Sequence, residues 1–317
     1  MNIIAEKPPI VKWTEKKILN QYVANRMISA GFTKRGRLML ECGTILSQKI
    51  CPDCGKSFIS SANLCRDRMC PTCSWRLSLK RFAEMCAVCQ TCQDITSYKA
   101  GFLTLTVKNC KAKDLKQTLK DMSTAWNRML ATVKKQIAVF GWARSVEITY
   151  NEQTYTFHPH YHIIILLDPA ADEGRCRAYF HKKWSQAWKE DYDPITDYRE
   201  ISADKTDIDQ PDFTAAILET YKYAVKSDDI ANMPTSIFRQ LVLAISGARL
   251  VAFGGIIKDT RRLLAFKEDE DLDEPSREIC DCGAPLQAAL LRWSFEEGMY
   301  KKMTTHFDGS AIAAYMK

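Results

Sequence analysis

The chain has 317 residues, of which 46% are hydrophobic and 26% charged, enough for a buried core in one large domain or two ordinary ones. No apolar run approaches the roughly 18 residues of a membrane span, and the N-terminus lacks the apolar core of a signal peptide, so we expect a cytoplasmic protein. The net charge of +7 excludes a histone-like polycation; the Lys/Arg clusters near the N-terminus fit a nucleic-acid partner and an ordinary solvated surface about equally well.

The first third of the chain combines helical periodicity with a dense block of cysteines. Apolar spacing predicts a helix over residues 13–30 and another over about 74–93. Nine of the thirteen cysteines fall between Cys42 and Cys92, and several form C-x-x-C pairs. In a cytoplasmic chain this usage indicates metal ligation rather than a disulfide framework.

After Lys99 the pattern changes to a succession of strands and helices. The periodicities predict strand, helix, strand, strand, helix, strand and helix, at residues 101–107, 113–140, 143–150, 155–167, 173–192, 195–201 and 212–229. The first six elements have the β-α-β-β-α-β order of a ferredoxin-like fold. We therefore expect an α+β domain whose antiparallel sheet carries its helices on one face. Residues 234–266 also have helical spacing with a Gly-Gly break, and an acidic run at 268–275 resembles a linker.

Three of the five histidines alternate along one predicted strand, at His158, His160 and His162. Residues two apart point to the same face of a strand, so the three imidazoles share one face. Glu147 lies between apolar neighbours on the preceding strand of the same hairpin, where it can oppose them. A lone histidine is more often structural, but this set favours a metal site. Mixed imidazole and carboxylate ligands suit Mn²⁺ or Mg²⁺, with Zn²⁺ also possible.

The helix that follows the last predicted strand carries Glu219 and Tyr223, which are four residues apart and therefore share a face. Lys222 and Lys226 flank that face, whereas Tyr221 projects to roughly the opposite side. Each residue alone is consistent with ordinary helix packing. Beside a metal that polarises a phosphate, the tyrosine can attack a DNA phosphodiester and the lysines can stabilise the phosphate charge. The carboxylate can activate water to hydrolyse the adduct.

Three segments, in this order, resemble the motifs of plasmid rolling-circle replication initiators of the HUH-endonuclease superfamily, where U is a bulky hydrophobic residue. They are "GFLTLTVKN", "FHPHYHIIILL" and "ETYKYAVK", with His160-Tyr161-His162 in the HUH position. Further segments, including "NLCRDRMCPTCSWRLSLKR" and "ISGARLVAFGGIIKD", are similar to the family's other recurring segments. The resemblance extends from about Trp13 to Phe266.

The resemblance implies a catalytic pair. Tyr223 matches the nicking tyrosine, and Glu219 matches the acidic residue that directs water onto the DNA at the end of a replication cycle. Some members of the superfamily use two tyrosines one helical turn apart. Because Glu219 occupies that position here, a single-tyrosine mechanism is implied. The enzyme would leave a 5′-phosphotyrosine and a free 3′-OH primer, and would terminate by strand transfer or hydrolysis.

The resemblance also implies a cofactor and partners. His160 and His162 match the metal ligands, and His158 and Glu147 remain alternatives for the remaining ligand of a divalent cation. The implied partners are origin DNA, single-stranded or in a hairpin, together with a host helicase and DNA polymerase. No membrane partner is expected.

Two sets of four cysteines compete for a structural Zn²⁺ site. Ligand chemistry favours two C-x-x-C pairs separated by fifteen residues, namely Cys51, Cys54, Cys70 and Cys73. The resemblance points instead to Cys42, Cys65, Cys70 and Cys73, and all six thiols together could hold two ions. Cys280 and Cys282 stay unassigned, because two ligands are too few for a site. Arg66 and Arg68, in the basic loop of this block, are candidates to contact DNA phosphates.

These inferences divide the chain into three expected regions: a helical, cysteine-rich, zinc-binding and DNA-contacting region (1–98), an HUH nicking domain (99–230), and a helical C-terminal region with an acidic linker and tail (231–317). One alternative is a zinc-ribbon DNA-binding regulator that would require neither Tyr223 nor Glu219. Another is a different HUH enzyme, a transposase or a conjugative relaxase. A relaxase commonly places its tyrosine before the histidines, whereas here it follows them.

Overall fold

The computed structural model describes residues 9–91, 98–201, 213–221, 225, 227–266 and 277–303. The chain forms two compact units, one from Met1–Leu77 together with Glu268–Lys317, the other from Ser78–Lys267. This division differs from the expected one into three consecutive regions. The second unit is an insertion in the first, because the C-terminal strands pair with an N-terminal strand.

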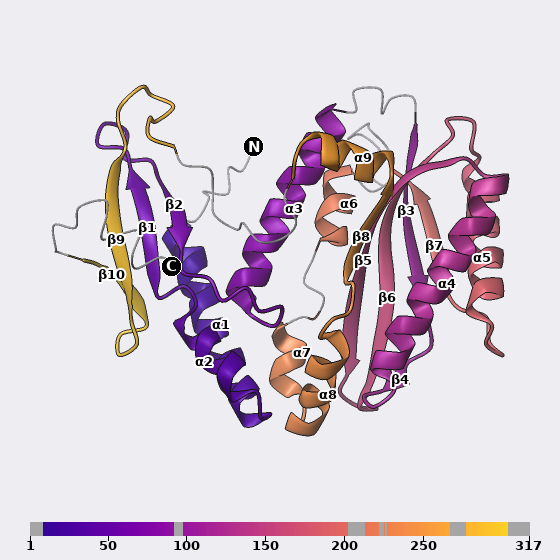
Figure 1. Cartoon of the computed structure of the whole chain (residues 1–317), viewed down its shortest axis with the longest axis horizontal. Helices are drawn as coiled ribbons and strands as arrows, with labels where there is room; N and C mark the ends of the chain where they lie inside the picture. The colour runs from indigo at the N-terminus through magenta and orange to yellow at the C-terminus, as the bar shows by residue number, and fades with distance from the viewer. Residues whose placement is uncertain are drawn as a thin grey trace. The chain divides into compact units, whose positions relative to one another are not determined.

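The first unit combines two N-terminal helices with a four-stranded antiparallel sheet, in the order β10-β9-β1-β2 (Figure 1). Its elements are α1 (Pro9–Ser29), α2 (Thr33–Glu41), β1 (Ile45–Ile50), β2 (Ser57–Ala62), β9 (Gln287–Ser294) and β10 (Met299–Lys302), and the first residues of α3 (Pro71–Thr91) also belong to it. The C-terminal tail, for which no secondary structure was predicted, contributes strands β9 and β10 to this sheet. In β9 the side chains of Ala289, Leu291 and Trp293 are buried at alternate positions, which is the period of a strand and not of a helix.

The second unit is built on an antiparallel sheet that runs β7-β3-β6-β5-β8, with a short strand β4 paired to β6. The strands are β3 (Lys99–Thr106), β4 (Cys110–Lys111), β5 (Val139–Asn151), β6 (Thr156–Leu167), β7 (Thr196–Glu200) and β8 (Val251–Gly255). With α4 (Leu115–Gln136) after β3 and α5 (Glu173–Trp188) after β6, the predicted β-α-β-β-α-β order and the α+β class are confirmed.

Helices cover both faces of this sheet, whereas the sequence predicted helices on one face only. On one face Tyr161 of β6 packs against Trp126 of α4 and Trp184 of α5, with ring centroids 6.5 and 6.3 Å apart. On the other, α6 (Phe213–Thr220) and α9 (Ile256–Leu263) join the part of α3 after Leu77 (Figure 1). Their apolar residues bury Ile164 and Leu166 of β6. The two faces arise because successive residues of β6 point in opposite directions.

The segment 234–266 was expected to be helical throughout, but it is not. It forms α8 (Thr235–Ile245), then strand β8, then α9. The Gly-Gly pair ends β8 close against β5. A Cβ added to Gly254 would lie 2.4 Å from the Trp142 ring. Gly255 has a φ of +59°, and a Cβ added to it would lie only 2.0 Å from the carbonyl oxygen of Phe140. Only glycine allows this approach, so the pair marks an edge strand rather than a helix break.

One helix was predicted over residues 212–229. In the described residues the structure has two helices there, α6 and α7 (Ser227–Asn232). Tyr223, Lys222 and Lys226 lie outside the described residues. The acidic run at 268–275 also lies outside them. None of the helices in the described ranges has both the length and the apolar character that crossing a membrane requires.

Candidate active site

Strand β6 presents His160 and His162 on the face of the sheet that α6 covers. The register of the antiparallel pair β5–β6 places Glu147 directly opposite His160. Directly opposite residues of antiparallel strands have their side chains on the same face, at Cβ separations of about 5 Å. Local pleating and strand register therefore bring the carboxylate to the two imidazoles.

The three side chains converge on a single point. Glu147 Oε2 lies 2.9 Å from His162 Nε2 and 3.3 Å from His160 Nε2. One ligand atom from each residue lies within 4.8 Å of the others, and all three residues are buried, at 6–9% exposure. Two imidazole nitrogens and one carboxylate oxygen at this separation can chelate one divalent cation.

The outer nitrogens of both imidazoles have partners that orient the rings. His162 Nδ1 lies 3.4 Å from Thr104 Oγ1, and His160 Nδ1 lies 3.2 Å from the carbonyl oxygen of His158. Both Nε2 atoms are thereby directed at Glu147. Such outer contacts fix ring orientation in metal sites and are part of their affinity.

The electrostatics keep Glu147 in its ligand form. Burial by itself raises the pKa of Glu147, but the hydrogen bonds and charges of His160 and His162 outweigh it, so the pKa of this carboxyl lies well below its usual range. For His158, burial and the neighbouring His160 lower the pKa. Among the described residues, His158 does not join the group of converging ligand atoms, so the geometry favours Glu147 as the third ligand.

Helix α6 brings a second carboxylate to the same place. Glu219 Oε1 lies 3.9 Å from His162 Nε2, and its side chain keeps 35% of its surface exposed. Tyr221, by contrast, is buried in the apolar cluster between α6 and the sheet, with its ring 6.5 Å from that of Phe253. This agrees with the expectation that Tyr221 faces away from the site.

Four cysteines of the first unit form a compact thiol cluster of their own, made of Cys42, Cys65, Cys70 and Cys73. The Sγ atoms of Cys42 and Cys73 are 3.5 Å apart, and those of Cys65 and Cys73 are 3.7 Å apart. Neighbouring sulfurs around a tetrahedral Zn²⁺ are separated by about 3.8 Å, given Zn–S bonds of about 2.3 Å. The structure therefore groups the cysteines as the family resemblance implied.

Several hydrogen-bond donors lie around this cluster. Backbone N–H groups of Cys65 and Arg66 donate to the sulfurs of Cys42 and Cys73, at 3.4 and 3.2 Å. Lys17 of α1 is fully buried nearby, and its Nζ donates to the carbonyl of Cys42 at 2.7 Å. Burial lowers the pKa of Lys17, while the charges of Cys42 and Cys70 oppose that effect. No sequence signal marks Lys17 as buried, since a lysine on an amphipathic helix is ordinarily exposed.

Cys51 and Cys54 do not join Cys70 and Cys73, so the set favoured by ligand chemistry alone is wrong. Their thiols instead meet Cys280 and Cys282, which the sequence left unassigned for want of further ligands. The signal that was missed is the similarity of "CPDCG" and "CDCG", each a pair of cysteines followed by glycine.

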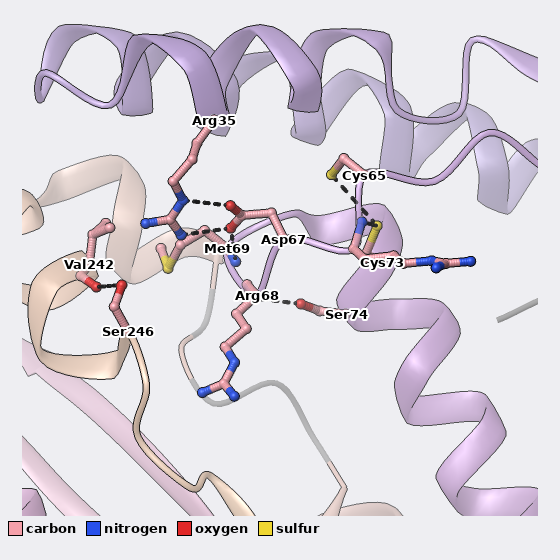
Figure 2. A network of polar contacts seen from close by, with 10 residues as sticks. Arg35, Cys65, Asp67, Arg68, Met69, Cys73, Ser74, Val242 and Ser246 are labelled. Carbon is pink, nitrogen blue, oxygen red and sulfur yellow. Dashed lines mark hydrogen bonds and ion pairs between the residues drawn. The ribbon is translucent and has the colours of Figure 1, made fainter. Parts of the chain in front are cut away.

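The loop between β2 and α3 carries both predicted DNA-contacting arginines, and both are exposed. Asp67, between them, is held by Arg35 of α2 through two hydrogen bonds of 2.7 and 3.0 Å, and it accepts from the N–H of Met69 (Figure 2). The Arg68 side chain extends away from this ion pair, while its carbonyl accepts from Ser74 Oγ at 3.0 Å (Figure 2). The loop is thus fixed at its backbone and presents its guanidinium groups to solvent.

Comparison with known proteins points to DNA replication. The sequence profile of a family described as "Replication protein" matches residues 56–301. The chain is 29% identical to "Protein rep" of Lentilactobacillus hilgardii over 300 residues, covering 91% of this chain and 94% of that protein. It is 31% identical to "Protein rep" of a Bacillus species over 265 residues, covering 76% and 84%. No solved structure matches the chain.

Proposed function

Because the chain belongs to the replication protein family, whose profile covers residues 56–301, we propose that it initiates rolling-circle replication of a plasmid by nicking one origin strand. The observation that carries this proposal is the convergence of Glu147, His160 and His162, with Glu219 beside them, on one face of the sheet. A regulator that only binds DNA has no use for a cation site next to a half-exposed carboxylate.

In the proposed reaction, Glu147, His160 and His162 hold a divalent cation, Mn²⁺ or Mg²⁺. The cation would polarise the scissile phosphate and neutralise the charge that builds on it. The ligand set fits such an ion, because one ionised carboxylate and two Nε2 atoms converge with the outer ring nitrogens already engaged.

Tyr223 is the proposed nucleophile. Its oxygen forms a bond to phosphorus while the bond from phosphorus to the 3′ oxygen breaks, so the 5′ end stays on the tyrosine and a 3′-OH is released as primer. Lys222 and Lys226 are proposed to stabilise the phosphate charge. A host helicase would unwind the duplex, and a host DNA polymerase would extend the primer.

Glu219 is proposed to end the cycle. With its carboxylate 3.9 Å from His162 Nε2, it lies where water near the cation could give up a proton to it. That water attacks phosphorus, the tyrosine oxygen leaves, and the 5′ phosphate is freed. Strand transfer follows the same path, with a DNA 3′-OH in place of water.

The first unit would hold the origin DNA. Zn²⁺ bound by Cys42, Cys65, Cys70 and Cys73 is proposed as a structural ion, because four thiolates leave no open position for chemistry. Its loop offers Arg66 and Arg68, exposed and on a fixed backbone, to DNA phosphates.

The test is formation of a covalent DNA–protein adduct. Single-stranded oligonucleotides tiling the DNA around the protein's own gene are mixed with the full chain and Mn²⁺, then resolved on a denaturing gel. We expect one oligonucleotide to yield a slowly migrating adduct with the wild type and with Tyr221→Phe, but none with Tyr223→Phe. If Tyr223→Phe still forms the adduct, the assigned nucleophile is wrong. If no oligonucleotide yields an adduct with wild type, the nicking function is wrong and the DNA-binding regulator becomes the better reading.

A further inference from the structure

Two turns at opposite ends of the chain have the same construction. In the first, the N–H of Cys51 donates to Lys56 O at 2.8 Å and the N–H of Gly55 donates to Cys51 O at 3.1 Å. In the second, the N–H of Cys280 donates to Ala284 O at 2.9 Å and the N–H of Gly283 donates to Cys280 O at 2.9 Å. Each turn therefore folds a cysteine pair back on itself in the manner of a metal-binding knuckle.

Both turns need their glycine. Gly55 and Gly283 have φ values of +71° and +91°, and neither would bring an added Cβ against another atom. The left-handed backbone, not space, therefore accounts for glycine at the same place in both turns. It lets the chain reverse after the second cysteine, so that both thiols of each pair point the same way.

The four thiols of the two turns meet in one group. The Sγ atoms of Cys51 and Cys282 are 3.5 Å apart, as are those of Cys54 and Cys280. All four lie within 4.8 Å of one another, and none forms a disulfide, whose sulfurs would be about 2.0 Å apart. The spacing is close to the separation of about 3.8 Å between sulfurs around a tetrahedral ion.

We propose that Cys51, Cys54, Cys280 and Cys282 bind a second Zn²⁺ ion, separate from the one proposed for the Cys42 cluster. Four thiolates complete a tetrahedron and leave no open position, so the site is structural. Cys54 and Cys280 are 226 residues apart in sequence, and Cys51 and Cys282 are 231 apart. The ion would therefore join an N-terminal turn to a C-terminal one.

Besides the pairing of β1 with β9, few contacts among the described residues hold these two turns together. The apolar cluster around them contains only Cys51, Cys280 and Ala284, with Leu286 packed against it. So small a core contributes too little hydrophobic free energy to hold two turns in place, and natural domains of this kind rely on a metal. Ion pairs add little: Lys56 lies 3.8 Å from Asp281 and Lys49 lies 2.8 Å from Glu278, and both acidic side chains are more than half exposed.

The site also bears on how the first unit folds. Strand β9 pairs with β1 directly beside the thiols, from Ile50 opposite Gln287 to Ile45 opposite Arg292. Closing a loop of more than two hundred residues carries an entropic cost before any pairing is gained. An ion that binds both turns fixes the register of β1 against β9 at the point where the pairing starts.

The test counts zinc in the intact chain. Protein purified without chelators is measured by mass spectrometry of its metals and by native mass spectrometry. We expect about two zinc ions per chain in the wild type and one fewer in Cys282→Ser, because a serine cannot replace a thiolate ligand. Cys110→Ser, at a half-buried cysteine outside both clusters, is the matched control and should keep the wild-type content.

Two further variants separate loss of the ligand from misfolding and from the other cluster. Cys282→His should regain the missing ion, because an imidazole completes a three-cysteine, one-histidine site. Cys65→Ser should lose one ion, and combination with Cys282→Ser should lose a second. The proposal is overturned if Cys282→Ser holds as much zinc as wild type, and its assignment to zinc is overturned if the freshly purified chain carries iron there. Neither outcome bears on nicking, which is read from the DNA adduct.

Discussion

Glu219 Oε1 lies 3.9 Å from His162 Nε2, although the two residues belong to different elements and are far apart in sequence. Helix α6 reaches this position because its apolar residues Ala216 and Ile217, with Tyr221 just after the helix, pack in the cluster that includes Ile164 and Leu166 of β6. Glu219 then lies close to the histidines on the same face of β6. The packing of α6 thus places a partly exposed carboxylate at the edge of the proposed cation site, where water has access.

The first prediction concerns Glu219→Ala. The variant should form the tyrosyl–DNA adduct at the wild-type rate but release it about 10²-fold more slowly, because the group that accepts the proton of water is absent. A denaturing gel of adduct against time measures both rates. Glu173→Ala is the control, because it removes a carboxylate on α5 that is exposed to a similar degree, 34%. Release at the wild-type rate from Glu219→Ala would show that Glu219 does not have this role.

The second prediction concerns the cation ligands. Glu147→Gln and His162→Ala should each abolish Mn²⁺ binding at micromolar protein, followed by electron paramagnetic resonance, and should abolish adduct formation. Removal of a ligand from a site with two or three protein ligands leaves too few donors to compete with water. His158→Ala should bind Mn²⁺ almost as well as wild type, since the contact to His160 comes from the backbone carbonyl of residue 158. If His158→Ala and Glu147→Gln behave alike, the choice of Glu147 as third ligand is wrong.

The third prediction tests the orientation of His162. Thr104→Val removes the hydroxyl 3.4 Å from His162 Nδ1 while keeping the shape of a β-branched residue in β3. Loss of such an outer contact costs about 10- to 100-fold in metal affinity. Mn²⁺ titration should show this weakening, and saturating Mn²⁺ should restore nicking. Nicking that stays low at saturation would mean that Thr104 acts otherwise than through the metal.

The fourth prediction concerns the buried Lys17. Lys17→Met should lower the free energy of unfolding by about 1–3 kcal/mol, because the carbonyls of Leu40 and Cys42 lose the Lys17 Nζ donor. Loss of the positive charge should also make the neighbouring cluster release zinc faster to a chelator. Lys12→Met, at an exposed position of the same helix, should change neither quantity. Equal stability of the two variants in urea unfolding would contradict the structural role of Lys17.

The fifth prediction concerns the two exposed arginines of the loop between β2 and α3. Arg66→Ala and Arg68→Ala should each weaken binding of origin DNA and reduce the slope of log affinity against log salt by about 1, the signature of one lost phosphate contact. Lys302→Ala, which removes an exposed charge on β10, should leave the slope unchanged. Fluorescence anisotropy between low and moderate salt measures the slope. An unchanged slope in both arginine variants would exclude this loop as a phosphate contact.

Local pattern was sufficient for what depends on neighbours in the chain. The alternation of residues in β6 placed His160 and His162 on one face, and the order of strands and helices after Lys99 predicted the α+β fold, because both follow from the period of an extended or helical backbone. The same reasoning failed for β8, which was expected to be helical, and it made no prediction for β9. Short apolar runs have no decisive period, and these two are strands because β5 and β1 offer edges to pair with.

The sequence by itself determined which residues are candidates for the chemistry: the histidines of β6, Glu147, Glu219 and the cysteine pairs. Only the tertiary structure decided which of them meet. Strand register, not spacing, brought Glu147 Oε2 within 2.9 Å of His162, and the pairing of β1 with β9 brought Cys282 to Cys51 across 231 residues. The physical reason is that periodicity reports the direction of a side chain from its own backbone, whereas a site depends on how separate segments pack, which no local pattern encodes.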